Sequence, residues 1–437
     1  MKKDTQHLEM AYQAWARCRD FRARRDRHKR FTFGEQWIDP VTDDRGTTTE
    51  LNYLIQNNKR PLTNNLLRRM VKTIVGLYRS RMAESDTYSS LPGDTARLNS
   101  LGELDARILE EFVISGCAVQ RVCDENRGGH YGAWVDNVDP RRFFVNRYSD
   151  PRGHDIELIG MLHDMSLPQL VNRFSKGSRS RAAELRAMLE EAPSQGVFSA
   201  EDILGIVGGG SEDFFNSPAG RMRVIELWTL EGRQCTVRDR VRVEMRWHCR
   251  WMAADGSLLD EYNSDFAHGS HPFAVKLYPL IDGEIHSFVE DVIDQQKTIN
   301  RHLVLVDSMM ASMAKGVLLM PQEALVKGMD YNLVGKLWSK PNSVLPYNAR
   351  GGVKPEQVTS SLQGTAAQSL LSLHMELFDK TSGVGDALLG QNVSAATGAK
   401  LYEAQVNNSA IILTDLLESF GCFIADRNDK IRTTLHP

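Results

Sequence analysis

The chain has 437 residues, enough for about three domains of ordinary size. Its composition, with 41% hydrophobic and 25% charged residues, is that of a globular protein and excludes a disordered or collagen-like chain. Lys and Arg number 53 and Asp and Glu 56, which gives a net charge of -3. No strong overall positive field therefore draws the chain to DNA or to membranes, and any contact with nucleic acid must come from local placement of charge.

Apolar segments and cysteines indicate the compartment. No stretch approaches the roughly 18 uninterrupted apolar residues of a membrane-spanning helix, and the N-terminal sequence has no apolar signal-peptide core. We therefore expect an intracellular protein that is neither secreted nor embedded in a membrane. The six cysteines are scattered without a C-x-x-C pair, which predicts free thiols in place of a disulfide framework or a structural zinc site.

Two basic helices are predicted near the N-terminus. Residues 7–30 contain no Gly or Pro and carry apolar residues at three- and four-residue spacing, with eight basic residues from Arg17 onward. A second basic helix is expected after Pro61, with Thr63 or Asn64 as its cap. An ordinary solvated helix face is one interpretation of both basic stretches.

The middle of the chain is predicted to mix helices and strands. Helical periodicity marks residues 101–113 and 167–189, and the composition of residues 193–220 is that of a loop. Alternation of apolar and polar residues predicts a half-buried strand at 117–122, and Asp255-Gly256 predicts a hairpin turn. Further strands are expected at residues 132–138, 143–145, 156–162, 223–230 and 236–251.

The longest uninterrupted helical pattern runs from residue 285 to about residue 315. At 1.5 Å per residue such a helix is about 45 Å long, and its apolar residues form a narrow seam of coiled-coil spacing. The seam suits packing against neighbouring chains, including copies of this one, although the central helix of an ordinary domain would show the same pattern. The seam residues expected to pack between subunits are Val292, Ile299, Leu303, Val306 and Met310.

A compact insertion is predicted after this helix. Residues 316–355 are expected to hold short strands at 317–320 and 343–345 around a small helix at 331–338. The remaining predicted elements are a helix at 356–382, a glycine-punctuated and almost uncharged segment at 383–398, and a final helix at 399–427.

A search for catalytic spacings finds no phosphate loop, no G-x-S-x-G elbow and no H-E-x-x-H helix. His154, Asp155, His163 and Asp164 could hold a metal in a phosphohydrolase, but such a site needs further His and Asp ligands. We therefore expect no catalytic residues, no metal site and no cofactor, which favours a structural or conduit role over an enzyme. A metal-dependent, DNA-processing hydrolase built on these four residues stays as the alternative.

Several segments, in their order along the chain, resemble the portal proteins of tailed bacteriophages. The first three lie in the N-terminal region, beginning with an aromatic-Gly-acid-Gln-Trp signature, and the others lie around the two long predicted helices. The segments are Phe31-Thr32-Phe33-Gly34-Glu35-Gln36-Trp37, Arg60-Pro61-Leu62-Thr63-Asn64-Asn65, Val71-Lys72-Thr73-Ile74-Val75-Gly76, Pro272-Phe273, Pro279-Leu280-Ile281-Asp282-Gly283, Asp291-Val292-Ile293-Asp294-Gln295-Gln296 with Asn300-Arg301, the strand at 316–319, and Thr381-Ser382-Gly383-Val384 with Leu388-Leu389-Gly390 before Ser394 and Gly398.

The resemblance implies an α+β portal fold. By position, residues 1–284 would form a mixed helix-and-sheet wing and residues 316–355 the clip. The two long helices, 285–315 and 356–382, would form the stem, and residues 383–398 the tunnel loop. Residues 399–437 would hold the C-terminal wing helix and a short or absent crown.

The resemblance also implies a function without chemistry of its own. The expected assembly is a ring, typically of twelve subunits, at one vertex of the virion capsid, assembled in the host cytoplasm. Double-stranded DNA would be packaged and ejected through it without sequence-specific contacts. The expected partners are terminase, adaptor or tail proteins, and the major capsid and scaffold proteins. A head-to-tail connector without a DNA channel is a further alternative.

Two sets of site residues follow from the resemblance. A channel that passes any DNA should neither read bases nor grip phosphates, because each neutralised phosphate adds affinity and therefore drag. The near-neutral segment expected to line the channel is Gly390, Gln391, Asn392, Val393 and Ser394. The clip residues expected to dock a partner are Met320, Tyr331 and Trp338. The basic helices would face DNA, the scaffold or acidic patches on neighbouring subunits, and the sequence does not choose among these.

Overall fold

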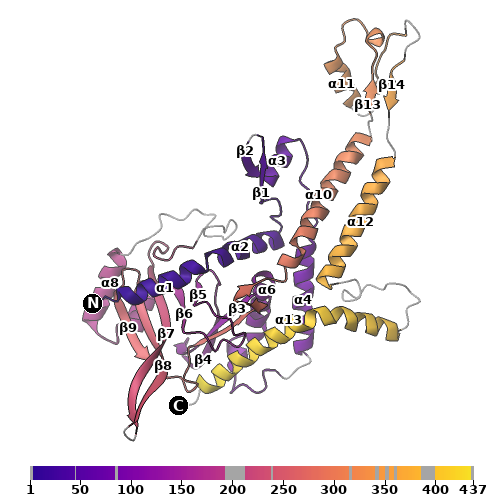
Figure 1. Cartoon of the computed structure of the whole chain (residues 1–437). Coiled ribbons are helices and arrows are strands. Elements are labelled where there is room, and N and C mark those ends of the chain that lie inside the picture. The colour runs from indigo at the N-terminus through magenta and orange to yellow at the C-terminus, as the bar shows by residue number, and fades with distance from the viewer. Residues whose placement is uncertain are drawn as a thin grey trace. The chain divides into compact units, whose positions relative to one another are not determined.

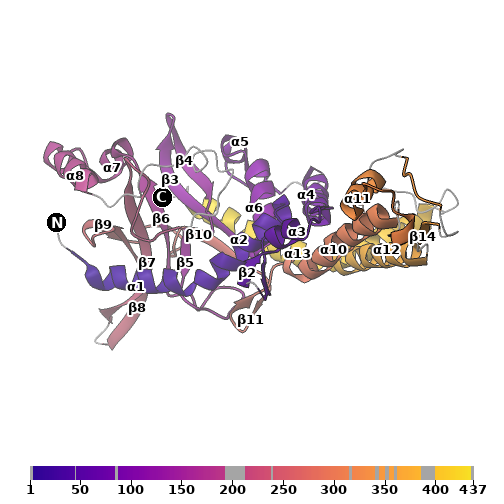
Figure 2. The same ribbon diagram turned by 90° about the horizontal axis from the view of Figure 1, so that it is seen from above.

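The computed structural model describes residues 3–44, 46–83, 87–191, 212–237, 240–313, 317–339, 344–349, 354–358, 362–384 and 399–434. The chain divides into two compact units, drawn in Figure 1 and turned by 90° in Figure 2. Unit 1 comprises Met1–Arg30, Arg69–Asp291 and Asp386–Pro437, and unit 2 comprises Phe31–Arg68 and Val292–Gly385. The expected channel-lining residues Gly390, Gln391, Asn392, Val393 and Ser394 lie outside the described residues.

The larger sheet of unit 1 has five antiparallel strands in the order β5-β6-β7-β8-β9. The strands span Phe143–Val145, Leu158–Met165, Met222–Val237, Arg240–Ala253 and Leu258–Asn263. The strands predicted in these regions are confirmed, and β7 and β8 form one long hairpin. The predicted Asp255-Gly256 turn joins β8 to β9, with Gly256 at a φ of +83° that favours glycine.

Close packing against this sheet explains a glycine inside a strand. A Cβ at Gly160 in β6 would lie 2.2 Å from the carbonyl oxygen of Glu226 and 2.6 Å from the ring of Phe144. Only glycine fits there without a shift of the neighbouring strand. The α1 helix (Thr5–Arg17) covers the same region, because Ala11 and Ala14 belong to the buried cluster that contains Phe144.

The other face of the sheet holds the main core of unit 1. Trp228 and Trp251 are each 1% exposed, and Phe174 packs on Trp251 with ring centroids 5.7 Å apart. Phe174 ends helix α7 (Leu167–Phe174), and α8 (Arg179–Glu191) follows. The prediction of one helix over 167–189 is therefore wrong. The chain breaks at Lys176 and Gly177, which both have positive φ angles and so end the first helix.

A three-stranded antiparallel sheet, β10-β3-β4, forms the rest of unit 1. Its strands are Phe273–Leu277, Cys117–Arg127 and His130–Asn137. Helices α6 (Leu101–Ser115) and α13 (Ala399–Thr434) both contact β3. All of residues 117–123 are buried, so the prediction of a half-buried strand at 117–122 is wrong: helices from distant parts of the chain cover it.

The predicted N-terminal helix is two helices, α1 and α2 (Arg19–Phe33), which meet at Cys18. The Cys18 N–H bonds to the carbonyl of Trp15 at 3.2 Å, three residues back, which tightens the last turn of α1. Arg22 donates to the same carbonyl at 2.6 Å and its guanidinium lies 3.7 Å from the centre of the Trp15 ring. These bonds hold the break in place.

Unit 2 combines a small N-terminal module with two long helices. The module is a hairpin of β1 (Pro40–Asp43) and β2 (Gly46–Thr49) followed by α3 (Glu50–Gln56). The long helices are α10 (Glu290–Met313) and α12 (Leu362–Ser382), which lie side by side in Figures 1 and 2. The helix α10 begins five residues later than predicted because a short hairpin of β11 (Leu280–Ile281) and β12 (Glu284–Ile285) occupies the residues before it.

A small module lies at the far end of these two helices (Figure 1). Its strands β13 (Val317–Leu319) and β14 (Glu356–Val358) pair antiparallel, and the predicted helix at 331–338 is present as α11 (Tyr331–Ser339). The predicted strand at 343–345 is wrong: Val344 and its described neighbours are not in a strand, and the partner of β13 lies where the second long helix was expected to begin. The other elements are α4 (Leu66–Ala83), α5 (Thr95–Leu98) and a 3-10 turn at Gln322–Ala324.

Candidate functional site

Amide side chains from distant segments meet on the first half of α10. Asn300 donates to Oε1 of Gln36 at 2.5 Å and accepts from the backbone N–H of Asn64 at 3.1 Å. Gln296 donates to the carbonyl oxygen of Asn64 at 2.7 Å and to Oδ1 of Asn300 at 3.1 Å. Gln36, Gln296 and Asn300 are each 1% exposed or less. These residues belong to the segments that resemble portal proteins. Their buried, hydrogen-bonded side chains form a connection inside unit 2, called the amide joint below.

The amide joint also caps helix α4. Oε1 of Gln296 accepts from the backbone N–H groups of Leu66 at 3.0 Å and Leu67 at 3.3 Å. Asn65 accepts from the N–H of Arg68 at 3.0 Å, three residues on, as a capping side chain does. The prediction of Thr63 or Asn64 as the cap is wrong by one or two positions. A glutamine on another helix supplies part of the cap, which no local sequence pattern reveals.

Ion pairs and an apolar cluster tie the small N-terminal module of unit 2 to α10. Lys297 pairs with Asp39, and Arg301 pairs with Glu50 at 2.6 Å. Trp37, Leu54 and Val304 form a buried cluster beside these pairs. Sequence reasoning missed this attachment, because the paired residues are more than 200 positions apart.

The five predicted seam residues of α10 differ in how much of each side chain is exposed. Val292 and Ile299 are 1% and 0% exposed, so they are already buried within a single chain. Leu303 and Val306 are half-buried, and Met310 is 66% exposed. Packing between subunits stays a prediction, and Leu303, Val306 and Met310 are the residues whose surface is free to serve it.

Helix α12 carries a second apolar stripe that the sequence analysis did not assign. Leu370, Leu373 and Leu377 are 47%, 48% and 41% exposed, and their spacing places them on one face of the helix. His302 of α10 and His374 of α12 stack with ring centroids 4.8 Å apart. Burial lowers the pKa of His302, and His374 beside it adds to this effect. The stack fixes which residues of the two helices stand at the same level.

The clip residues lie in the small module at the end of the two helices. Tyr331, at the start of α11, is 52% exposed, while Met320 and Trp338 are half-buried. Val344 and Tyr347 in the neighbouring segment are 85% and 43% exposed. The module therefore presents several large apolar side chains, although the docking of a partner there stays a prediction.

The residues of the hydrolase alternative belong to separate structural contacts. His154 is exposed, and Asp155 accepts the backbone N–H of Ser149 at 2.8 Å within a surface turn. His163 bonds to the buried carboxylate of Glu226 at 2.8 Å, and Asp164 pairs with Arg223 and Arg142, each at 2.8 Å. No group of three or more His, Cys, Asp or Glu side chains in the described part of the chain could hold a metal ion.

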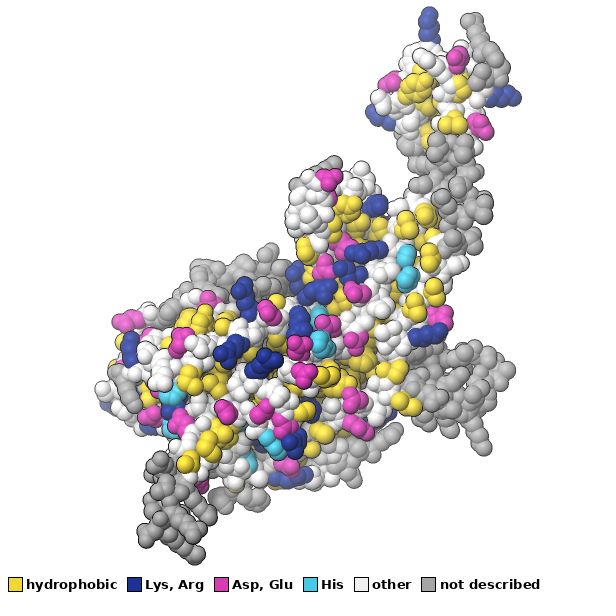
Figure 3. Space-filling model, in the orientation of Figure 1, with side chains coloured by type: hydrophobic (Ala, Val, Ile, Leu, Met, Phe, Trp, Pro, Cys, Tyr) yellow, Lys and Arg dark blue, Asp and Glu magenta, His cyan; other side chains and the backbone are white. Residues whose placement is uncertain are grey.

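The basic face of α2 is partly structural. Arg25 is buried and makes a two-pronged bond to Glu111 at 2.7 and 2.8 Å, and Arg22 is buried against Trp15. His28 is 3% exposed and bonds to the hydroxyl of Ser287 at 2.9 Å. Other Lys and Arg side chains of the region remain on the surface, where Figure 3 shows several of them along α2. A solvated helix face thus describes only part of this stretch.

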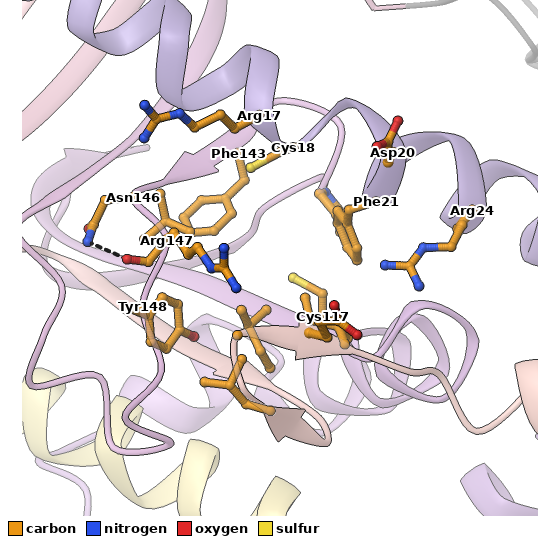
Figure 4. Close-up of a pocket in the computed structure, with 17 residues that line it drawn as sticks. Arg17, Cys18, Asp20, Phe21, Arg24, Cys117, Phe143, Asn146, Arg147 and Tyr148 are labelled. Carbon is orange, nitrogen blue, oxygen red and sulfur yellow. Dashed lines mark hydrogen bonds between the residues drawn. The ribbon is translucent and has the colours of Figure 1, made fainter.

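A pocket of about 720 Å³ opens in unit 1 beneath the junction of α1 and α2 (Figure 4). Cys18 and Phe21 line it from the helices, and Cys117, Phe143 and Tyr148 line it from the strands. Burial raises the pKa of the Cys117 thiol well above its usual value, which keeps this thiol neutral. Sequence reasoning missed the pocket, because its walls come from four separate stretches of the chain.

Two long helices with exposed apolar stripes, ending in a small module with exposed aromatic residues, define a subunit built to pack against other protein chains. In the described residues, no helix has the length and apolar character that crossing a membrane requires. The family model described as Phage P22-like portal protein matches residues 8–420, and the chain belongs to this family. A search of curated proteins finds no match.

Family membership confirms the fold class and function expected from the sequence. The chain is a phage portal protein with a mixed α+β fold, and it forms the channel for DNA at the capsid vertex. Proteins of this family are structural, and membership implies an oligomeric ring in the virion.

Proposed function

We propose that the chain closes into a ring, typically of twelve copies, in which the apolar stripe of α12 packs on the stripe of α10 in the next copy. A cyclic ring joins two different surfaces of each subunit, and both must lie at the same height along the ring axis, because rotation moves nothing along that axis. The His302–His374 stack supports this arrangement. Leu303 follows His302 and Leu373 precedes His374, so the two stripes stand at the same level.

The other proposed roles come from the division of the chain into wing, stem, clip and tunnel loop that the resemblance to portal proteins implies. Double-stranded DNA passes through the ring without base-specific contacts, and Gly390, Gln391, Asn392, Val393 and Ser394 line its narrowest part. Terminase docks during packaging, and adaptor or tail proteins dock afterwards on the clip residues Met320, Tyr331 and Trp338. The major capsid and scaffold proteins surround the ring. The chain has no catalytic activity of its own in this function.

Mass photometry and negative-stain imaging of two matched variants test the ring. Leu373→Lys places a charge in the α12 stripe and should leave monomers, because an unpaired charge in an apolar contact is costly. Ser372→Lys adds the same charge at the exposed neighbouring position, which is about 100° away around the helix, and should still form rings. Wild-type protein that stays monomeric over a wide concentration range would refute the proposal. Rings without an axial hole would favour a connector without a channel.

A further inference from the structure

We propose that the pocket at the junction of α1 and α2 binds an acidic peptide segment of another protein, with a large apolar side chain as its anchor. The pocket lies wholly within unit 1 and has a volume of about 720 Å³. This volume is in the usual range for sites that bind a ligand. The proposal does not depend on the ring, because all of the residues that line the pocket belong to one chain.

The interior of the pocket is mostly apolar. Phe143, Val145 and Tyr148 are buried side chains of the main core that also line the pocket wall. Leu277 and Leu280 lie at the edge of the same core and line the pocket together with Ile285. An apolar surface of this kind gains free energy when an apolar side chain replaces water, in proportion to the area covered.

The rim of the pocket carries more positively charged than negatively charged side chains. Arg17 and Arg24 contribute to the lining, and neither takes part in an ion pair within the described part of the chain. Arg147 points into the pocket in Figure 4 and donates to the carbonyl oxygen of Asp282 at 3.2 Å. Asp20 and Glu284 are the acidic members of the lining. Three guanidinium groups against two carboxylates leave a net positive rim that is able to make charge-assisted bonds to a peptide carboxylate.

This combination favours a peptide over DNA. A duplex presents phosphates on a convex surface and has no apolar group that could fill the interior. Its evenly spaced charges would also meet Asp20 and Glu284, whereas a peptide is able to place its carboxylates opposite the arginines alone. The occupant that satisfies both the interior and the rim is an apolar side chain flanked by Asp or Glu residues.

The test uses fluorescence anisotropy of the full-length protein with the labelled peptide SEDLFEDGS. We expect saturable binding that Arg24→Glu weakens about tenfold, equivalent to one lost charge-assisted contact. Arg19→Glu is the matched control, because Arg19 lies on the same helix, is exposed and does not line the pocket. It should leave the affinity unchanged. Replacement of the Leu-Phe pair in the peptide by Ser-Ser should weaken binding at least tenfold.

Five results would overturn the proposal. The first four are no binding to the wild-type protein, equal losses for Arg24→Glu and Arg19→Glu, undiminished binding of the Ser-Ser peptide, and displacement of the peptide by a short DNA duplex. Binding to monomers with none to assembled rings would show that a second copy of the chain fills the pocket, which would also contradict a separate partner. Ring formation is scored independently by mass photometry, so failure here leaves the proposed function untouched.

Discussion

The buried pair between Asp105 and Arg427 offers the sharpest test of how unit 1 holds its last helix. Arg427 on α13 makes two bonds of 3.0 Å to the two carboxylate oxygens of Asp105 on α6, and both side chains are 0% exposed. Asp105 also accepts from Gln120 at 3.1 Å and from the hydroxyl of Tyr88 at 2.8 Å. Four donors thus converge on one carboxylate.

The substitution Asp105→Asn keeps the shape and removes the charge. The amide has one acceptor oxygen where the carboxylate has two, so one guanidinium N–H of Arg427 faces an N–H group in either orientation of the amide. The positive charge of Arg427 then stays buried without a counter-charge. Breaking a buried pair in this way costs about 3–5 kcal/mol of the free energy of unfolding. That is a large part of the roughly 5–15 kcal/mol that stabilises a typical domain.

Urea unfolding followed by tryptophan fluorescence measures this cost. Five of the seven tryptophans belong to unit 1, so the signal reports chiefly on that unit. The control is the double variant Asp105→Leu with Arg427→Met, which removes both charges and should be less destabilised than the two single changes summed, by about 2 kcal/mol. A loss below about 1 kcal/mol for Asp105→Asn would refute the claim that the pair is desolvated and essential to unit 1.

Three further outcomes are expected. Burial lowers the pKa of His28 to about 4, so the fold binds this side chain in its neutral form and loses stability as the pH falls from about 6.5 towards 4. Urea unfolding at pH 7.5 and at pH 4.5 measures how much free energy of unfolding is lost between the two values. For His28→Gln this loss should be smaller than for the wild type by about 3 kcal/mol, and an equal loss in both proteins would contradict the prediction. The double variant Tyr331→Ala with Trp338→Ala should form rings but bind its tail adaptor at least about tenfold more weakly in surface plasmon resonance. An affinity equal to that of the wild type would remove these residues from the docking site. Asn392→Lys should slow DNA packaging in an in vitro assay while rings form normally, because the new charge attracts phosphates; an unchanged rate would show that Asn392 does not line the narrowest point.

Local patterns in the sequence predicted most of the helices and strands but fewer of the residues at which they begin and end. The long helices, the hairpin turn at Asp255-Gly256 and four of the five strands of the larger sheet were predicted, whereas β9 was not. The break at Cys18 was missed, because a buried Arg22 that binds the Trp15 carbonyl has the same sequence signature as an exposed helical arginine. Burial of β3 on both faces was missed, because the covering helices α6 and α13 lie far apart in the chain.

The candidate site shows the same limit. Spacing alone placed an apolar seam on α10, but it could not show that Val292 and Ile299 are buried within one chain whereas Met310 is exposed. The stripe on α12 follows helical spacing as well, and exposure is the property that separates it from a core stripe. The pocket in unit 1 and the pair of Asp105 with Arg427, 322 positions apart, depend on long-range contacts that a periodicity cannot encode.

The amide joint between Gln36 and Asn300 also constrains how relatives of this chain are able to diverge. Each amide satisfies the other within a space closed to water, so an apolar replacement at one position strands the polar group at the other. A substitution of Gln36 or Asn300 is therefore tolerated only when the other residue changes as well. Aligned descendants should show these two columns either both retained or both exchanged together.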